Sequence, residues 1–413
     1  MSITEPAAKP HVSLRDIALT FLKVGTFGFG GGVGMLALIR DTVVERKRWI
    51  SEGELSVAVA MGQMLPGPFV SNYAEYIGYE LRGFAGMSVA VVALLLPCFV
   101  LICGLSVLYF RFGSVPLVMR LFTGVQPVVV AILAWATWSI GRANVRSWQA
   151  GVIGVLAAAA LFLRVDVLLV VLGCGVLGML LQGKGEGGGR AADCRAQKAD
   201  VKLPKTEAEG KWDGGASKLL MAVAPVWLWG SMVGAVLPAV AARGGELALV
   251  FLKVGTIIFG GGFAAIPFLQ HEVVDVHHWL SMREFIDGVA LGQITPGPVA
   301  ITGAFIGYKV LGLPGALIAT LGTFLPSTFM LLGLIHVYRR IRGNRLVAGF
   351  LSGVMPAVTG MLLVATVFIG RTAIVGPVPA VMAAVALALI AWLRLDPIWL
   401  ILGGAAVGLS MPV

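Results

Sequence analysis

Charged side chains are scarce in this sequence. Only 13% of its 413 residues are Asp, Glu, Lys or Arg, whereas 58% are hydrophobic. Soluble domains contain about 25% charged residues, so this composition excludes an ordinary soluble domain. It predicts an all-α polytopic membrane protein. The formal net charge of +10 lies mostly in loops, where we expect it to set orientation and contact lipid headgroups rather than bind nucleic acid.

Cysteine is also rare. The chain has four cysteines and no Cys-x-x-Cys pair, which argues against a disulfide framework or a zinc site. The run His-Glu-Val-Val-Asp at His271–Asp275 resembles a zinc-binding His-Glu-x-x-His motif, but its last position is an aspartate. Trp279 follows closely, as in a loop at the membrane interface. We therefore expect neither a metal nor a cofactor.

Glycine and proline, in contrast, are plentiful, with 55 and 20 residues. Both interrupt helices. At membrane depth, broken backbone is tolerated only where it is buried in protein or lines a cavity. The composition therefore predicts broken helices within the membrane.

The sequence is duplicated. Phe21–Gly32 and Phe251–Gly262 share ten of twelve residues at a spacing of 230, and each copy carries a lysine seven residues before a glycine triplet. Gly62–Pro68 (GQMLPGP) returns at the same spacing as GQITPGP, and the matches continue to Asp166 and Asp396. We infer one unit of about 160 residues present twice. The predicted parts are an N-terminal repeat (1–182), a polar linker (183–218), an extra apolar span (219–242) and a C-terminal repeat (243–413).

Each half contains eight predicted helical segments. In the first half they cover 13–28, 31–46, 51–64, 67–82, 86–110, 114–141, 148–163 and 165–182. A 16-residue helix extends about 24 Å, less than the hydrocarbon core of about 30 Å. We therefore interpret the first four segments as two re-entrant or broken hairpins, followed by longer spans.

Loop charges predict that the two halves are inverted relative to each other. Arg46–Arg48 corresponds to Val276–His278, while the single Arg111 corresponds to the basic run Tyr338–Arg345. Positive clusters thus exchange loops, as expected for inverted repeats with the extra span between them. The N-terminus has no signal-peptide pattern. We expect the N-terminus and linker in the cytoplasm and the C-terminus outside.

The interrupted helices predict an anion site. Helices that begin after a glycine turn or at Gly-Pro offer free backbone N–H groups and the positive end of their dipoles. Lys23 and Lys253 would add positive charge, and Gln63 and Gln293 would add hydrogen bonds. The predicted substrate-binding residues are Lys23, Gly30, Gly31, Gly32, Gln63, Pro66, Gly67, Pro68, Lys253, Gly260, Gly261, Gly262, Gln293, Pro296, Gly297 and Pro298.

Plainer interpretations remain open for these residues. The glycines could serve close helix packing, and the lysines could extend to the membrane surface. Glu75 is a carboxylate in an apolar segment, with Asn72 and Tyr73 beside it. Such a residue is a functional hypothesis by default, either as a proton-binding group or as a partner of Lys23 or Arg82 in an ion pair.

The spacing of these motifs resembles a known family. Gly30-Gly31, Val44, Trp49 and Pro66-Gly67-Pro68 follow the signature of the chromate ion transporter family, in its long-chain two-domain form. The second half repeats this signature at Gly260-Gly261, Val274, Trp279 and Pro296-Gly297-Pro298. The resemblance implies a secondary transporter in a bacterial plasma (inner) membrane that exports chromate and confers resistance, with sulfate as a competing or exchanged anion.

Two alternative functions stand beside chromate export. Within transport, the alternative is a carrier of sulfate or another oxyanion. A membrane-embedded enzyme acting on a phosphorylated lipid would need an acid/base or nucleophile cluster, which the sequence lacks. The expected partners are chromate, sulfate and membrane lipid, with a homodimer as a candidate assembly and no nucleic acid.

Overall fold

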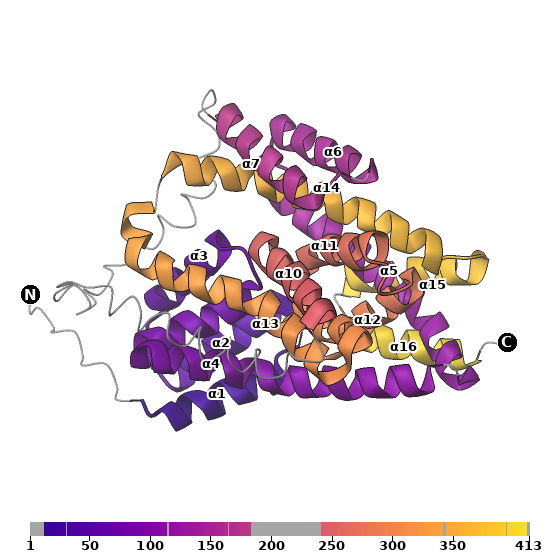
Figure 1. Cartoon of the computed structure of the whole chain (residues 1–413), viewed down its shortest axis with the longest axis horizontal. Helices are drawn as coiled ribbons and strands as arrows, with labels where there is room; N and C mark the ends of the chain where they lie inside the picture. The colour runs from indigo at the N-terminus through magenta and orange to yellow at the C-terminus, as the bar shows by residue number, and fades with distance from the viewer. Residues whose placement is uncertain are drawn as a thin grey trace, which may run out of the picture.

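The fold is a bundle of α-helices (Figure 1). The computed structural model describes residues 12–29, 31–113, 115–163, 165–182, 241–341, 344–393 and 395–410, and these contain no strand. The predicted linker and extra span (183–242) lie almost wholly outside the described residues. Their boundaries and role therefore stay predictions.

The two halves contain matching series of helices. The first comprises α1 (Leu14–Phe27), α2 (Gly31–Ile39), the π-helical turn η1 (Arg40–Arg46), α3 (Glu52–Met64), α4 (Phe69–Phe112), α5 (Pro116–Asn144), α6 (Trp148–Phe162) and α7 (Val167–Gln182). The second comprises α10 (Ala241–Ile257), η3 (Gly262–Ala264), α11 (Ala265–Gln270), η4 (His271–Val276), α12 (Met282–Ile294), η5 (Val299–Ile301), α13 (Thr302–Ile341), α14 (Arg345–Ala373), α15 (Pro377–Ala388), η6 (Leu389–Leu393) and α16 (Pro397–Ser410).

The same local devices define the elements in both halves. Ser51 and Ser281 each begin a helix with a reciprocal capping box, to Glu54 and Glu284 respectively. α4 is kinked at Arg82–Gly83 and α13 at Leu311–Gly312, with nearly identical backbone angles. The predicted break after residue 82 therefore exists, as a kink within one long helix.

Four of the described helices are long and apolar enough to cross a membrane, namely α4, α5, α13 and α14. The remaining helices are shorter. α1, α3, α10 and α12 have 14, 13, 17 and 13 residues, and they end in the turns that carry the glycine and Pro-Gly-Pro motifs. The described chain is thus an all-α polytopic membrane protein with broken hairpins.

The halves are intertwined rather than side by side. The hairpin α6–α7 of the first half packs along α14 of the second (Figure 1), while α15 and α16 pack on α5. Glycines permit these contacts: Gly353 lies against the backbone of Cys174 and Gly178, and Gly404 lies against that of Gly124. Small residues at helix crossings let backbones approach closely, which is how helices associate in lipid.

The broken-helix turns also exchange hydrogen bonds between halves. Gly67 of the first Pro-Gly-Pro donates its N–H to the carbonyl of Ile258, at 2.6 Å. Gly297 of the second donates to the carbonyl of Gly28, at 2.9 Å. Both glycines have φ between +106° and +108°, a conformation that other residues rarely adopt. These two bonds are equivalent in the repeat, and they join the ends of α1 and α10 to the opposite half.

The glycine packing can be tested on α16. Gly404→Leu places a side chain against the Gly124 carbonyl and Val128, so we expect a loss of about 1–3 kcal/mol of stability from overpacking. The neighbouring Gly403 is exposed and has no atoms near its potential side chain. Gly403→Leu should therefore be tolerated. Thermal stability of both variants in detergent measures the difference, and equal stability would contradict the packing account.

Candidate functional site

A small cavity of about 50 Å³ lies beside one of the reciprocal turns. Its walls come from the α1–α2 turn, from η3, from the end of α12 with the turn to η5, and from the loop before α16. Gly28, Phe263, Gln293 and Asp396 represent these four segments. Residues from both halves thus meet at one point, next to the hydrogen bond from Gly297 to Gly28.

Gln293 gives the cavity an unused hydrogen-bond donor. Its Nε2 atom is buried and has no partner among the described residues. Thr295 donates its hydroxyl to the carbonyl of Leu291 and so is already engaged. A buried donor without an acceptor is costly, because it has lost its bonds to water. An oxygen ligand in this cavity would satisfy the Gln293 amide.

The two predicted glutamines have different surroundings. Gln63, the counterpart of Gln293, is exposed and hydrogen-bonds the hydroxyl of Tyr73. Pro66, Gly67 and Pro68 are buried beside it, and Gly67 contacts Ser327 of α13. Pro296, Gly297 and Pro298 are likewise buried. Both motifs thus shape the interior, while only the second has a glutamine on the cavity.

The glycine turns of the two halves enclose one aromatic ring. The ring of Phe69 occupies the space beside Gly32 of the first half and Gly261 of the second. Gly262 contacts Val299, and Gly260 lies near Met355 and Val358. Gly30 lies outside the described residues. The glycine turns of the two halves therefore meet with a phenyl ring between them, and their role in anion binding stays a prediction.

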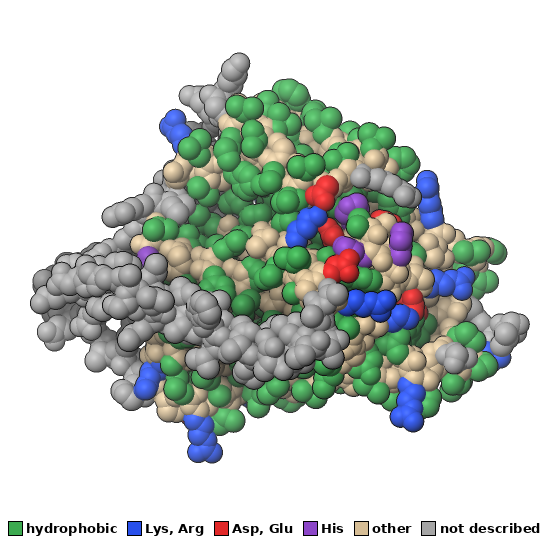
Figure 2. All heavy atoms as spheres, in the orientation of Figure 1, with side chains coloured by type: hydrophobic (Ala, Val, Ile, Leu, Met, Phe, Trp, Pro, Cys, Tyr) green, Lys and Arg blue, Asp and Glu red, His purple; other side chains and the backbone are tan. Residues whose placement is uncertain are grey.

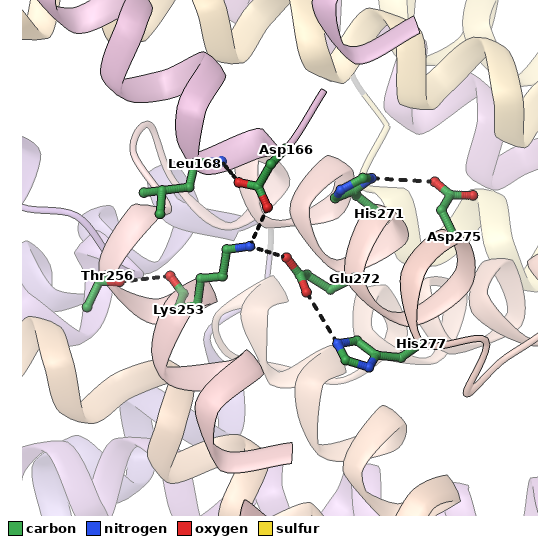
Figure 3. Close-up of polar contacts among 8 residues, drawn as sticks. All are labelled: Asp166, Leu168, Lys253, Thr256, His271, Glu272, Asp275 and His277. Atoms are coloured by element: carbon green, nitrogen blue, oxygen red, sulfur yellow. Dashed lines mark hydrogen bonds and ion pairs between the residues drawn. The ribbon is translucent and has the colours of Figure 1, made fainter. Parts of the chain in front are cut away.

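Lys253 is held by two carboxylates (Figure 3). Its Nζ atom lies 2.7 Å from Asp166 Oδ2 and 2.8 Å from Glu272 Oε1. Asp166 comes from the loop between α6 and α7, and its other oxygen accepts the backbone N–H of Leu168. Glu272 also lies 3.6 Å from His277. The ammonium is thus neutralised within a network that links the two halves.

Lys23, the counterpart of Lys253, has no hydrogen bond or ion pair among the described residues. It is exposed on α1 and lines a second, larger cavity. Glu272 is replaced by Thr42 at the equivalent position, and Asp166 corresponds to Asp396. Asp396 caps α16 through the backbone N–H of Ile398 and lines the small cavity. The two predicted lysines therefore have different surroundings, and neither lines the small cavity.

Glu75 is completely buried and has no salt bridge among the described residues. Its Oε1 accepts a hydrogen bond from Thr328 of α13, while Oε2 has no partner. Both polar atoms of the neighbouring Asn72 are also unpaired. Arg82 instead donates to the carbonyl of Val12. Pairing of Glu75 with Lys23 or Arg82 is therefore not observed, and the carboxyl faces the other half of the protein.

Sequence reasoning overlooked a second buried carboxylate, Asp287. It lies in α12 and accepts hydrogen bonds from Tyr109 of α4 and Gln126 of α5, both at 2.8 Å. Its counterpart in the first half is Val57. An aspartate within the apolar run FIDGVALGQI was the available signal, but its partners are 161 and 178 residues away in the chain.

These features define a class. The protein is a multi-pass helical membrane protein built from two intertwined copies of one repeat, whose broken helices meet at an internal polar cavity. The family model "Chromate transporter" matches residues 15–179 and 245–409, which are the two repeats. The chain therefore belongs to the chromate transporter family, and it is a transporter and not an enzyme.

Individual relatives agree with this assignment. The chain is 30% identical over 405 residues to the chromate transport protein of Cupriavidus metallidurans, covering 97% of this chain and 94% of that protein. It is 31% identical to the probable chromate transport protein of Synechococcus elongatus, covering 88% and 86% of the two chains. It is 30% identical to the chromate transport protein of Pseudomonas aeruginosa, covering 88% and 83%. No solved structure matches the chain.

The network around Lys253 predicts different roles for the two lysines in stability. Lys253→Gln leaves Asp166 and the buried Glu272 without their cation. We expect a loss of about 1–3 kcal/mol, between the values typical of exposed and buried pairs. Lys23→Gln, at the unpaired counterpart, should change stability by less than about 0.5 kcal/mol. Thermal unfolding in detergent compares them, and equal losses would refute the asymmetry.

Proposed function

We propose that this protein is a secondary transporter that exports chromate from the cytoplasm. The observation that carries the proposal is the small cavity beside the Gly297–Gly28 bond, which residues of both halves line, among them Gln293, whose Nε2 has no partner among the described residues. Broken helices that meet between repeats are a common construction of transporter binding sites. The choice of chromate as the substrate rests on family membership, because several relatives bear the name chromate transport protein.

The chemistry of the turns suits an oxyanion. Chromate is a tetrahedral dianion whose oxygens accept hydrogen bonds from backbone N–H groups and amides. Gln293 offers such a donor, and the N-terminal ends of helices favour negative charge. Sulfate has nearly the same shape and charge. We therefore propose sulfate as a competing or exchanged anion, and a carrier of sulfate or another oxyanion as the second candidate function.

The membrane potential favours export. Moving two negative charges out of an inside-negative cell gains about 4.6 kcal/mol at 100 mV. The proposed orientation places the N-terminus and linker in the cytoplasm and the C-terminus outside, with the second repeat inverted relative to the first. Its support is the exchange of basic loops between Arg46–Arg48 and Tyr338–Arg345.

Flux into proteoliposomes tests the transport function. Purified protein should carry radiolabelled chromate across the membrane faster than empty liposomes do, and sulfate on the same side should compete. Acceleration by sulfate on the opposite side would indicate exchange. No chromate flux above that of empty liposomes would reject the proposal, while sulfate flux alone would favour the second candidate.

Variants of Gln293 link that flux to the cavity. Gln293→Leu removes the amide donor, and a hydrogen bond to a charged group is worth about 1.5–3 kcal/mol. We expect the apparent KM for chromate to rise by about tenfold or more. Gln293→Glu should weaken uptake further, because it adds a negative charge. Unchanged KM in both variants would move the substrate site away from this cavity.

A native cysteine tests the orientation. Cys194 lies in the linker, whereas Cys98, Cys103 and Cys174 are buried. A membrane-impermeant maleimide should label the protein in permeabilised cells but leave it unlabelled in intact cells. Cys194→Ser should abolish the labelling and serves as the control. Labelling in intact cells would place the linker outside and contradict the orientation.

A further inference from the structure

A larger cavity of about 530 Å³ opens between α1 and η1, apart from the small cavity at the turns. Three cations and one carboxylate line it, so its charge is predominantly positive. Its lining residues are Leu19, Thr20, Lys23, Leu38, Asp41, Thr42, Arg46 and Lys47.

The cations differ in how firmly they are held. Arg46 pairs with Asp41 at 2.9 Å, and Lys47 lies 4.5 Å from the centre of the Trp49 ring. Lys23 has no such partner among the described residues. One ion pair thus neutralises one cation, while two ammonium groups keep their charge. Two uncompensated positive charges match one tetrahedral dianion.

The second half lacks this excess of positive charge at the equivalent positions, where Arg46 becomes Val276 and Asp41 becomes His271. Arg48 and His278, which follow this segment, both adopt the rare positive φ of about 50°, so the backbones correspond closely. There Thr42 becomes Glu272 and Lys47 becomes His277. Figure 2 shows acidic, basic and histidine side chains gathered over α10 and α11, on a face that is otherwise largely hydrophobic.

In the second half, carboxylates of the protein itself bind the basic side chains at the equivalent place. Glu272 and Asp166 bind Lys253, and His277 lies 3.0 Å from Glu246. Carboxylates outnumber the lysine there, so a dianion would be repelled. Lys23 of the first half is thus available to bind a ligand, whereas Lys253 of the second half is paired with carboxylates.

We propose that the cavity formed by Lys23, Arg46 and Lys47 is a docking site for a tetrahedral oxyanion before it reaches the turns. The inference deepens the proposed function and rests on it. Charges on a concave surface concentrate counter-ions and raise association rates, and salt screens this effect. The second-half counterpart is occupied by carboxylates, so the two halves bind an oxyanion unequally.

Neutralising the cavity provides the first test. The double variant Arg46→Gln/Lys47→Gln should raise the Kd for chromate and sulfate about five- to tenfold at low ionic strength, measured by equilibrium dialysis of the purified protein. Flux should show a similar rise in KM with unchanged kcat. Arg48→Gln is the matched control, because it removes a cation from the same loop but outside the cavity. It should leave Kd unchanged.

Copying the second half onto the first provides an independent test. Thr42→Glu introduces the carboxylate of Glu272 beside Lys23, and it should weaken oxyanion binding at least as strongly as the double variant. Thr42→Gln, of similar size without the charge, should bind nearly as wild type does. If both Thr42 variants bind equally, or if Arg48→Gln matches the double variant, the cavity is not the docking site.

Two further arms separate related outcomes. Anionic lipid headgroups share the chemistry of the ligand, so binding is compared in phosphatidylcholine vesicles with and without phosphatidylglycerol. The proposal would be overturned, and the cavity assigned to lipid, by two results together. Phosphatidylglycerol would abolish sulfate binding, and in vesicles without phosphatidylglycerol the wild type would bind sulfate no more tightly than the double variant. Salt-sensitive binding without chromate flux would retain the docking site and reject the transport function. Absence of wild-type binding would reject the docking site.

Discussion

Two backbone hydrogen bonds constrain the centre of this protein. A broken helix leaves N–H and carbonyl groups without partners, and within a membrane no water is at hand to replace them. Here Gly67 donates to Ile258 and Gly297 donates to Gly28, so each half satisfies the broken end of the other. Neither half has this arrangement alone. The intertwining of α6 and α7 with α14, and of α15 and α16 with α5, follows the same reciprocity and keeps the four turns together.

Duplication preserved the backbone but let the side chains diverge. The capping boxes and the kinks are the same in both halves, and so are three positive-φ positions, Arg48/His278, Gly67/Gly297 and Gly83/Gly312. The charges differ: Lys253 is bound by two carboxylates, whereas Lys23 faces an open cavity. Buried carboxylates differ as well, since Glu75 and Asp287 occupy positions that are apolar in the other repeat. The scaffold is thus nearly symmetric, while the charges that it carries are not.

The repeat and its helix-breaking residues sufficed to predict most of the described helices. Glycine triplets and Pro-Gly-Pro act locally, and the predicted segments 51–64 and 148–163 match α3 and α6 within one residue at each end. Long-range pairing was not accessible in the same way. Nothing near Lys253 in sequence identifies Asp166, 87 residues away, as its partner. For the same reason Asp287 was overlooked and the lysines were expected together. Side-chain partners depend on tertiary packing, which a single sequence specifies only indirectly.

The segment after each Pro-Gly-Pro differs between the halves in its length and in the side chain that meets the glycine turns. The spacing between the halves is 230 at Pro68 and Pro298 but 229 at Gly78 and Gly307, so the first half holds one more residue after its Pro-Gly-Pro. The ring of Phe69, in that segment, reaches both Gly32 and Gly261, between the two glycine turns. Because the turns are reciprocal, an equivalent ring from the second half would compete for the same space. The second half instead places the smaller Val299 against Gly262. Phe69 alone can therefore fill the space between the two glycine turns, which two phenylalanine rings, one from each half, could not share.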